Sequence, residues 1–144
     1  MCIRDRPTYT DEEERRRQIV IEMHKAFSDI DPDALTDLFT DDGVVHMVML
    51  DPIEGRDAIH AMMVRWRDDY PNIHSELLKA FADGEVVLTE WIDHYDWLGK
   101  HYDIPIMGIV EFQADKIRSW RIFVDRIMAD MVGGQYPDIV KSAS

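Results

Sequence analysis

One strand-like segment, residues 86–97, combines a carboxylate with large aromatic side chains. Side chains of a strand alternate between its two faces, so Trp91, Asp93 and Tyr95 share one face. A carboxylate held against aromatic side chains loses solvation, which raises its pKa toward neutrality and suits it to general acid–base chemistry. The alternative is that Asp93 caps a loop or pairs with an arginine. On the first interpretation Asp93 carries a proton, and an indole N–H of Trp91 or Trp120 or the Tyr95 hydroxyl stabilises negative charge on an oxygen.

Residues 117–125 form a second alternating segment. Trp120, Ile122 and Val124 make an apolar face, and only that face can join a pocket beneath the helices. Arg121 and Asp125 point the other way, where arginine and carboxylate usually form structural ion pairs.

The sequence offers little support for other chemistries. It contains no glycine-rich nucleotide-binding loop, no G-x-S-x-G nucleophile motif and a single cysteine, Cys2. No two histidines have the i, i+4 spacing of a helical zinc site; the six are His24, His46, His60, His74, His94 and His101. We therefore expect no cofactor and no metal.

Helical patterns come first along the chain. Thr10 to Glu13 reads as a capping box, and apolar residues then recur at helical spacing, with His24 at the edge of their face. His24 either faces a cavity and forms a dyad with Asp93 or is a surface residue. Asp31-Pro32 begins a short second helix, and a third helix ends before Pro71.

Strand patterns follow. We expect strands at 44–50, 73–82, 86–97, 101–112 and 117–127, with a turn at 52–55 and hairpin-length links between the last four. Three N-terminal helices followed by an antiparallel meander predict an α+β fold in which a curved, mainly antiparallel sheet wraps around the helices as a cone-shaped barrel.

Length and charge bound the remaining possibilities. The chain has 144 residues and a formal net charge of -13, which suits one acidic domain and argues against nucleic-acid binding. No apolar run is long enough to span a membrane, and we expect a cytoplasmic protein. We place the domain at 10–132, between a leader at 1–9 and a tail at 133–144. Residues 1–6 resemble a translated adapter sequence of the kind found in metagenomic gene predictions.

Several segments together resemble the limonene-1,2-epoxide hydrolase family. They are the stretch that runs from residues 38–42 to residues 55–59, residues 88–93, residues 104–109, and residues 116–121 followed by Asp125. That family belongs to the nuclear transport factor 2-like superfamily, with ketosteroid isomerase and the SnoaL-like polyketide cyclases. The resemblance implies a cone-shaped α+β barrel with one apolar pocket, often a homodimer through the outer face of the sheet.

The resemblance also implies an active site that this sequence mostly lacks. The epoxide hydrolases use an Arg flanked by two Asp, plus a Tyr and an Asn that hold the attacking water. Asp93 matches the first Asp, whereas the other four positions hold Trp91 (Arg), Ile122 (second Asp), Val45 (Tyr) and Met47 (Asn). The base of ketosteroid isomerase would also fall at Met47.

These replacements predict an apolar cavity with Asp93 as its single ionisable group, unless large side chains fill the space. The expected lining residues are Phe27, Val45, Met47, Trp66, Ile104, Ile106, Trp120, Ile122 and Val124. We expect an enzyme that isomerises, dehydrates or cyclises a hydrophobic small molecule such as a terpenoid, steroid-like or polyketide compound. Epoxide hydrolysis is one alternative, and a non-catalytic module for apolar-ligand binding or dimerisation is another.

Overall fold

The computed structural model describes residues 8–125, so the predictions for residues 1–7 and 126–144 lie outside it. Residues 8–125 form three helices: α1 (Asp11–Ser28), α2 (Pro32–Asp37) and α3 (Arg56–Asp69). Six strands complete the domain: β1 (Phe39–Met47), β2 (Ile53–Glu54), β3 (His74–Asp83), β4 (Val86–Trp97), β5 (Lys100–Gln113) and β6 (Lys116–Val124).

The helix ends follow from local chemistry. The Thr10 hydroxyl accepts a hydrogen bond from the Glu13 amide at 3.1 Å and donates to the Glu13 carboxylate at 3.2 Å. Asp31 caps α2 by accepting from the Ala34 amide at 3.0 Å, with Pro32 in the first turn. α3 ends at Asp69 because Tyr70, which precedes Pro71, leaves the helical region of backbone conformation at φ -132° and ψ 68°.

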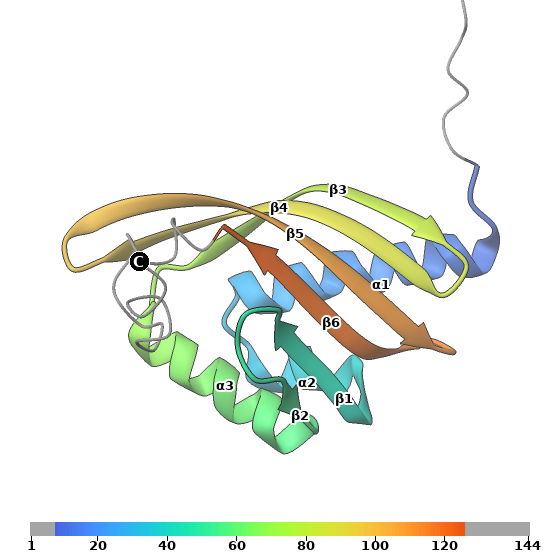
Figure 1. Cartoon of the computed structure of the whole chain (residues 1–144), viewed down its shortest axis with the longest axis horizontal. Coiled ribbons are helices and arrows are strands. Elements are labelled where there is room, and N and C mark those ends of the chain that lie inside the picture. Colours follow the sequence, from blue (N-terminus) through green and yellow to red (C-terminus); the bar gives the residue numbers. More distant parts are fainter. Residues whose placement is uncertain (1–7, 126–144) are drawn as a thin grey trace, which may run out of the picture.

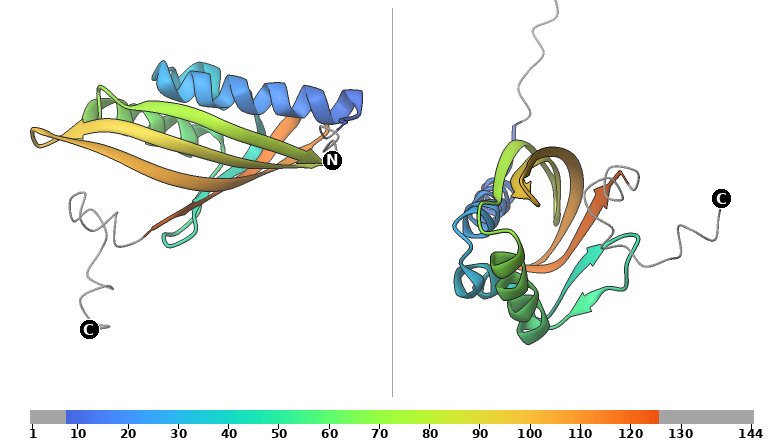
Figure 2. Two further views of the ribbon diagram at one scale, coloured as in Figure 1. Left: turned by 90° about the horizontal axis from the view of Figure 1, so that it is seen from above. Right: turned by 90° about the vertical axis from the view of Figure 1, so that its left-hand side faces the viewer.

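The strands form one mixed sheet in the order β2-β1-β6-β5-β4-β3. Neighbouring strands are antiparallel except β1 and β6, which run parallel. The sheet curls over α1 and α3, so that its concave face covers the helices (Figures 1 and 2). The predicted α+β fold, a curved sheet wrapped around three helices, is confirmed.

Two expectations near the first strand were wrong. β1 begins at Phe39 rather than 44, because residue 39 pairs with Ile117 of β6, and it ends at Met47, where the Leu50 amide closes a turn at 2.8 Å. The predicted turn at 52–55 contains the short strand β2, which pairs with β1. The pairing of β1 with β6 joins residues distant in sequence, so local patterns do not report it, and β2 is only two residues long.

The core fills the space between the concave face and the helices. Its fully buried members come from every layer: Val20, Met23, Leu35, Phe39, Val45, Ile59, Met63, Val87, Trp91, Val110, Ile117 and Trp120. Gly108 makes this packing possible, because a Cβ there would lie 2.7 Å from Cζ3 of the Trp91 indole. The side chain of Trp91 therefore packs directly against the backbone of β5.

Arginines near the start of α1 attach the helix to the sheet. Arg16 is buried and donates to the carbonyl oxygens of Gly84 at 2.8 Å and Ala114 at 3.3 Å, in two different hairpin turns. Arg17 donates to the Ala80 carbonyl at 2.9 Å, and Arg15 pairs with Asp115 at 3.0 Å. The three arginines therefore have a structural role, because they hold α1 against the sheet.

Candidate active site

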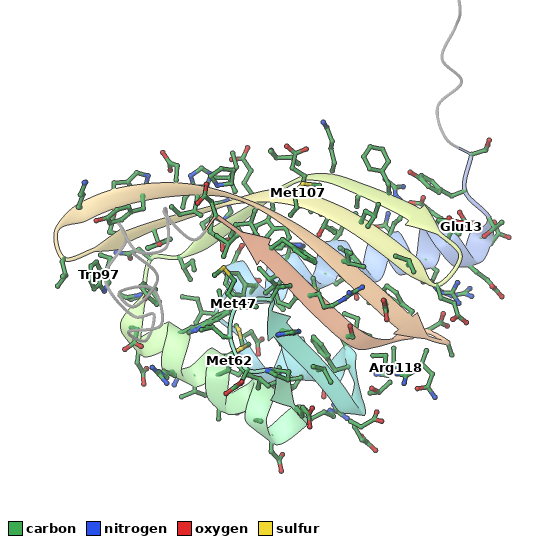
Figure 3. All side chains as sticks on the ribbon, in the orientation of Figure 1. Glu13, Met47, Met62, Trp97, Met107 and Arg118 are labelled. Atoms are coloured by element: carbon green, nitrogen blue, oxygen red, sulfur yellow. The ribbon has the colours of Figure 1, made fainter. Side chains whose placement is uncertain are left out.

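A cavity of about 490 Å³ lies between the concave face of the sheet and α3. Met47 from β1 and Met62 from α3 both point into this space (Figure 3). The volume is in the range of small-molecule sites, and the wall is mainly apolar. Its residues are Phe27, Met47, Leu50, Ile53, Ala58, Ala61, Met62, Arg65, Trp66, Tyr70, Ile73, Asp93, Tyr95, Ile104, Ile106 and Val124.

Strand β4 brings Asp93 to this wall. Its inward face also carries Trp91 and Tyr95, as the alternation predicts, and Tyr95 lines the cavity beside Asp93. In the sheet Asp93 lies between Ser75 of β3 and Ile104 of β5. Among the described residues, Asp93 is the only carboxylate on the cavity wall.

Burial controls the charge of Asp93. The residue as a whole is half-buried, but its Oδ1 atom is fully buried and has no hydrogen-bond partner among the described residues. Desolvation raises the pKa of this carboxyl to about 7. Polar contacts with Ser75 and Trp91 and the charge of His94 lower the pKa and so oppose part of this rise. Near neutral pH the group is therefore present in both protonation states.

His24 of α1 lies deeper, behind Ser75. It is 3% exposed, its Nδ1 lies 2.8 Å from the Ser75 hydroxyl, and its ring packs against Trp91 with 4.9 Å between ring centres. Burial lowers the pKa of this imidazole to about 4, so it is neutral at physiological pH. The Ser75 hydroxyl thus lies between the imidazole and the strand position of Asp93.

This placement corrects both expectations for His24. It is not a surface residue, because β3 covers that side of α1. It does not line the cavity, and the hydrogen bond that its ring makes is to Ser75 rather than to Asp93. Ser75 and Trp91, each of which contacts both residues, therefore connect His24 with Asp93.

The predicted lining residues fall into two groups. Six of them are on the cavity wall: Phe27, Met47, Trp66, Ile104, Ile106 and Val124. The other three, Val45, Trp120 and Ile122, are in the core behind it, each at most 3% exposed, and so is Trp91, which was predicted as an oxyanion donor. They do not line the cavity because the large side chains of the concave face pack against α1 and one another. Of the three predicted oxyanion donors, only Tyr95 therefore reaches the cavity.

The other half of the wall was not predicted from the sequence. Ala58, Ala61, Met62 and Arg65 form one side of α3, Leu50 comes from the turn after β1, and Ile53 is the first residue of β2. Positions 58, 61, 62 and 65 share a helical face, so the periodicity was available as a signal. Small alanines and an arginine do not, however, mark a core-facing stripe. Arg65 is exposed and lies near Asp69, with 3.7 Å between Nε and Oδ2.

On the outer face of the sheet, Arg121 pairs with Glu111 of β5 at 3.0 Å. Asp125 is exposed.

The family model of the SnoaL-like domain matches residues 20–120. The chain belongs to this family. The match extends from α1 to β6 and so includes Asp93, Ser75 and most of the cavity wall. No helix of residues 8–125 is long and apolar enough to cross a membrane.

Solved structures share the fold of this SnoaL-like chain at low sequence identity. An LEH-like epoxide hydrolase of M. tuberculosis is 21% identical, with a TM-score of 0.75, over 91% of this chain and 98% of that one. SalBIII is an epoxide hydrolase/cyclase-like enzyme described in pyran ring formation in the polyether salinomycin. It is 22% identical, with a TM-score of 0.73, over 82% and 96% of the two chains.

A hypothetical protein of Catenulispora acidiphila with a ketosteroid isomerase-like fold, in complex with trimethylamine, is 22% identical. Its TM-score is 0.74, over 84% of this chain and 95% of that one. At these identities the likeness concerns the fold alone.

Proposed function

We propose that this SnoaL-like protein is an enzyme that moves a proton on a small hydrophobic molecule, with Asp93 as the general acid and base. The supporting observation is that Asp93 lies on the wall of an apolar cavity of about 490 Å³ and has its pKa raised to about 7. A pKa near the working pH gives both the base that removes a proton and the acid that returns it. The reaction class is isomerisation, dehydration or cyclisation of a terpenoid, steroid-like or polyketide compound.

In the simplest form of this reaction the Asp93 carboxylate removes a proton from a carbon next to a substrate carbonyl. The electron pair of the broken C–H bond moves into the carbonyl, and the oxygen gains negative charge. Tyr95, two positions along the same strand face, is the donor that would hydrogen-bond this oxygen. The carboxyl of Asp93 then returns the proton to another carbon, which completes an isomerisation without a further reactant.

Ser75 is the positioning residue in this proposal. Its hydroxyl contacts the neutral His24, and its polar contact with Asp93 favours the carboxylate. A hydroxyl that accepts from the His24 Nδ1–H can donate its own proton to Asp93. The pair would hold one side of the carboxylate in the wall and leave the other side for substrate.

Deuterium exchange tests the proton transfer without knowledge of the natural substrate. The protein is incubated with carvone, a terpenoid ketone, in D₂O, and exchange at the carbon beside the carbonyl is followed by NMR. We expect exchange above the uncatalysed rate, and its loss in Asp93→Asn, which keeps the shape of the side chain. Glu90→Gln is the matched control, because Glu90 lies on the opposite face of β4 and pairs with Lys79. Exchange that survives in Asp93→Asn would refute the role of Asp93.

Epoxide hydrolysis is the second candidate, because two proteins with similar structures are an LEH-like epoxide hydrolase and the epoxide hydrolase/cyclase-like enzyme SalBIII. The sequence resemblance implies that Val45 and Met47 replace the Tyr and Asn that hold the attacking water in that family, and Val45 is buried in the core. We therefore expect no diol from limonene oxide above the uncatalysed rate. Diol formation that disappears in Asp93→Asn would make hydrolysis the function.

A carrier role predicts a different pair of results. Carvone or limonene oxide would then bind without exchange or hydrolysis, and Asp93→Asn would bind them as tightly as the unchanged protein.

We further propose that the protein forms a homodimer through the outer face of its sheet and acts in the cytoplasm. Exposed apolar side chains lie on neighbouring strands of this face, with Phe81 opposite Leu88 and Met107 opposite Phe123. Met107 is 61% exposed and projects from the outer side of the sheet (Figure 3). Light scattering of Met107→Glu tests the interface, and a dimer unaffected by this charge would place the contact elsewhere.

A further inference from the structure

A cluster of imidazoles and carboxylates lies on the outer face of the β4–β5 hairpin, on the side of β4 opposite to Asp93. His94 and Asp103 are direct partners across the two strands, and so are Asp96 and His101. The rings of His94 and His101 are nearly parallel, with 6.5 Å between their centres. This hairpin forms one end of the molecule (Figure 1, left).

Two ring nitrogens converge on one carboxylate oxygen. Nδ1 of His94 lies 2.6 Å from Oδ1 of Asp103, and Nε2 of His101 lies 2.8 Å from the same atom. One donor atom from each of the three residues lies within 4.8 Å of the other two. Two imidazole nitrogens and one carboxylate oxygen are a donor set that suits zinc and its first-row neighbours.

The other nitrogen of each ring is also held by a carboxylate. Nε2 of His94 lies 2.7 Å from Oε2 of Glu76 on β3, and Nδ1 of His101 lies 2.8 Å from Oδ1 of Asp96. Metal-binding histidines commonly donate this second N–H to a carboxylate, which orients the ring and makes the ligating nitrogen more basic. Both rings therefore already have the outer partners that such a site requires.

We propose that His94, His101 and Asp103 bind a divalent first-row transition-metal ion of the Zn²⁺ type, with Glu76 and Asp96 orienting the two imidazoles. Tetrahedral zinc with bonds of about 2.1 Å separates its ligand atoms by roughly 3.4 Å. The two nitrogen–oxygen distances would therefore widen by less than about 1 Å on binding, which side-chain rotation can supply. Asp103 and His101 are each 58% exposed, so water can complete the coordination.

The charge balance of the cluster also favours a cation. Three carboxylates surround two imidazoles, so the five side chains carry a net charge of -1 with both rings protonated and of -3 once each ring has given up a proton for a metal ion. His74 stacks on the far side of His94, with 6.1 Å between ring centres, and is not one of the three ligands. A divalent ion would replace the protons shared between the rings and Asp103 and would join β4 to β5 near the segment that carries Tyr95.

Titration of tag-free protein with ZnCl₂ by calorimetry tests the site. We expect one zinc ion per chain, with binding weakened by more than about tenfold in His101→Ala and in Asp103→Asn, since loss of an outer partner alone costs about 10–100-fold. Glu76→Gln removes only an outer partner of His94 and should weaken zinc binding by about 10–100-fold. The matched control is His60→Ala, because His60 is a surface histidine on α3 paired with Asp33 at 2.9 Å. This control should bind zinc like the unchanged protein.

Histidine ring ¹⁵N spectra locate the ion independently of the calorimetry. Zinc should shift the resonances of His94 Nδ1 and His101 Nε2 and leave those of His60 unchanged. The proposal is overturned if the unchanged protein does not bind zinc, if His101→Ala and Asp103→Asn bind it equally well, or if His60→Ala loses it too. Asp103→Asn keeps the shape of the side chain, so this test does not depend on a disruptive substitution.

Discussion

Replacing Asp93 by asparagine should change the pH dependence of stability by an amount that follows from the structure. Burial raises the pKa of this carboxyl from its ordinary 3.8 to about 7. Between these two pH values the folded protein holds a proton that the unfolded chain has released. The free energy of unfolding contributed by Asp93 therefore falls as the pH rises, at about 1.4 kcal/mol per pH unit. Over the whole interval this amounts to about 4 kcal/mol.

The second buried group, His24, has the opposite effect. Its pKa is lowered from 6.5 to about 4, so between these values the unfolded chain binds a proton that the folded protein does not. His24 therefore contributes stability above pH 6.5 that is lost as the pH falls toward 4. In the unchanged protein the two effects nearly cancel between pH 4 and 6.5, and a simple pH profile would not reveal either.

The difference in free energy of unfolding between Asp93→Asn and the unchanged protein isolates the contribution of Asp93. Urea unfolding of the unchanged protein and of Asp93→Asn at pH 5, 6, 7 and 8 gives the difference in free energy of unfolding at each pH. The asparagine has no charge to lose, so the variant should gain stability relative to the unchanged protein by about 3 kcal/mol between pH 5 and pH 8. Glu90→Gln, on the outer face of the same strand, should show no such change. A difference independent of pH would mean that Asp93 is solvated in the folded state, and would refute the proposed acid–base role.

Three further perturbations test the packing around the site. His24→Phe should remove the pH-dependent stability that His24 contributes. As the pH falls from 6.5 to 5, the free energy of unfolding of the variant relative to the unchanged protein should therefore rise by about 2 kcal/mol, measured by urea unfolding. A difference in free energy that stays constant with pH would contradict the buried, neutral imidazole. Gly108→Ala should destabilise the protein by about 1–3 kcal/mol, since the new Cβ would lie 2.7 Å from Trp91, and an unchanged urea midpoint would show that the indole can move. Ala61→Phe should fill the cavity from α3 and weaken carvone binding at least about tenfold. The circular dichroism spectrum should stay the same, because position 61 is exposed on the cavity wall. Undiminished binding would place the ligand elsewhere.

Local patterns predicted the α+β class and most of the element positions. Capping at Thr10 and Asp31, proline at 71 and the alternation of residues 86–97 act within a few residues, so the sequence shows them directly. The start of β1 was misplaced because β1 pairs with β6, far along the chain, and the two-residue strand β2 was predicted only as a turn. Pairing of distant strands leaves no local signal of this kind.

The sequence by itself determined that Asp93 shares a strand face with Trp91 and Tyr95, because side-chain alternation depends only on the backbone of one strand. Only the tertiary structure decided that this face opens on a cavity, that Trp91 and Trp120 fill the core behind it, and that His24 is buried against Ser75. The cluster of His94, His101 and Asp103 was equally invisible, since it depends on the register between β4 and β5. Distances between side chains on different elements follow from sheet curvature and strand register, which the whole chain sets at once.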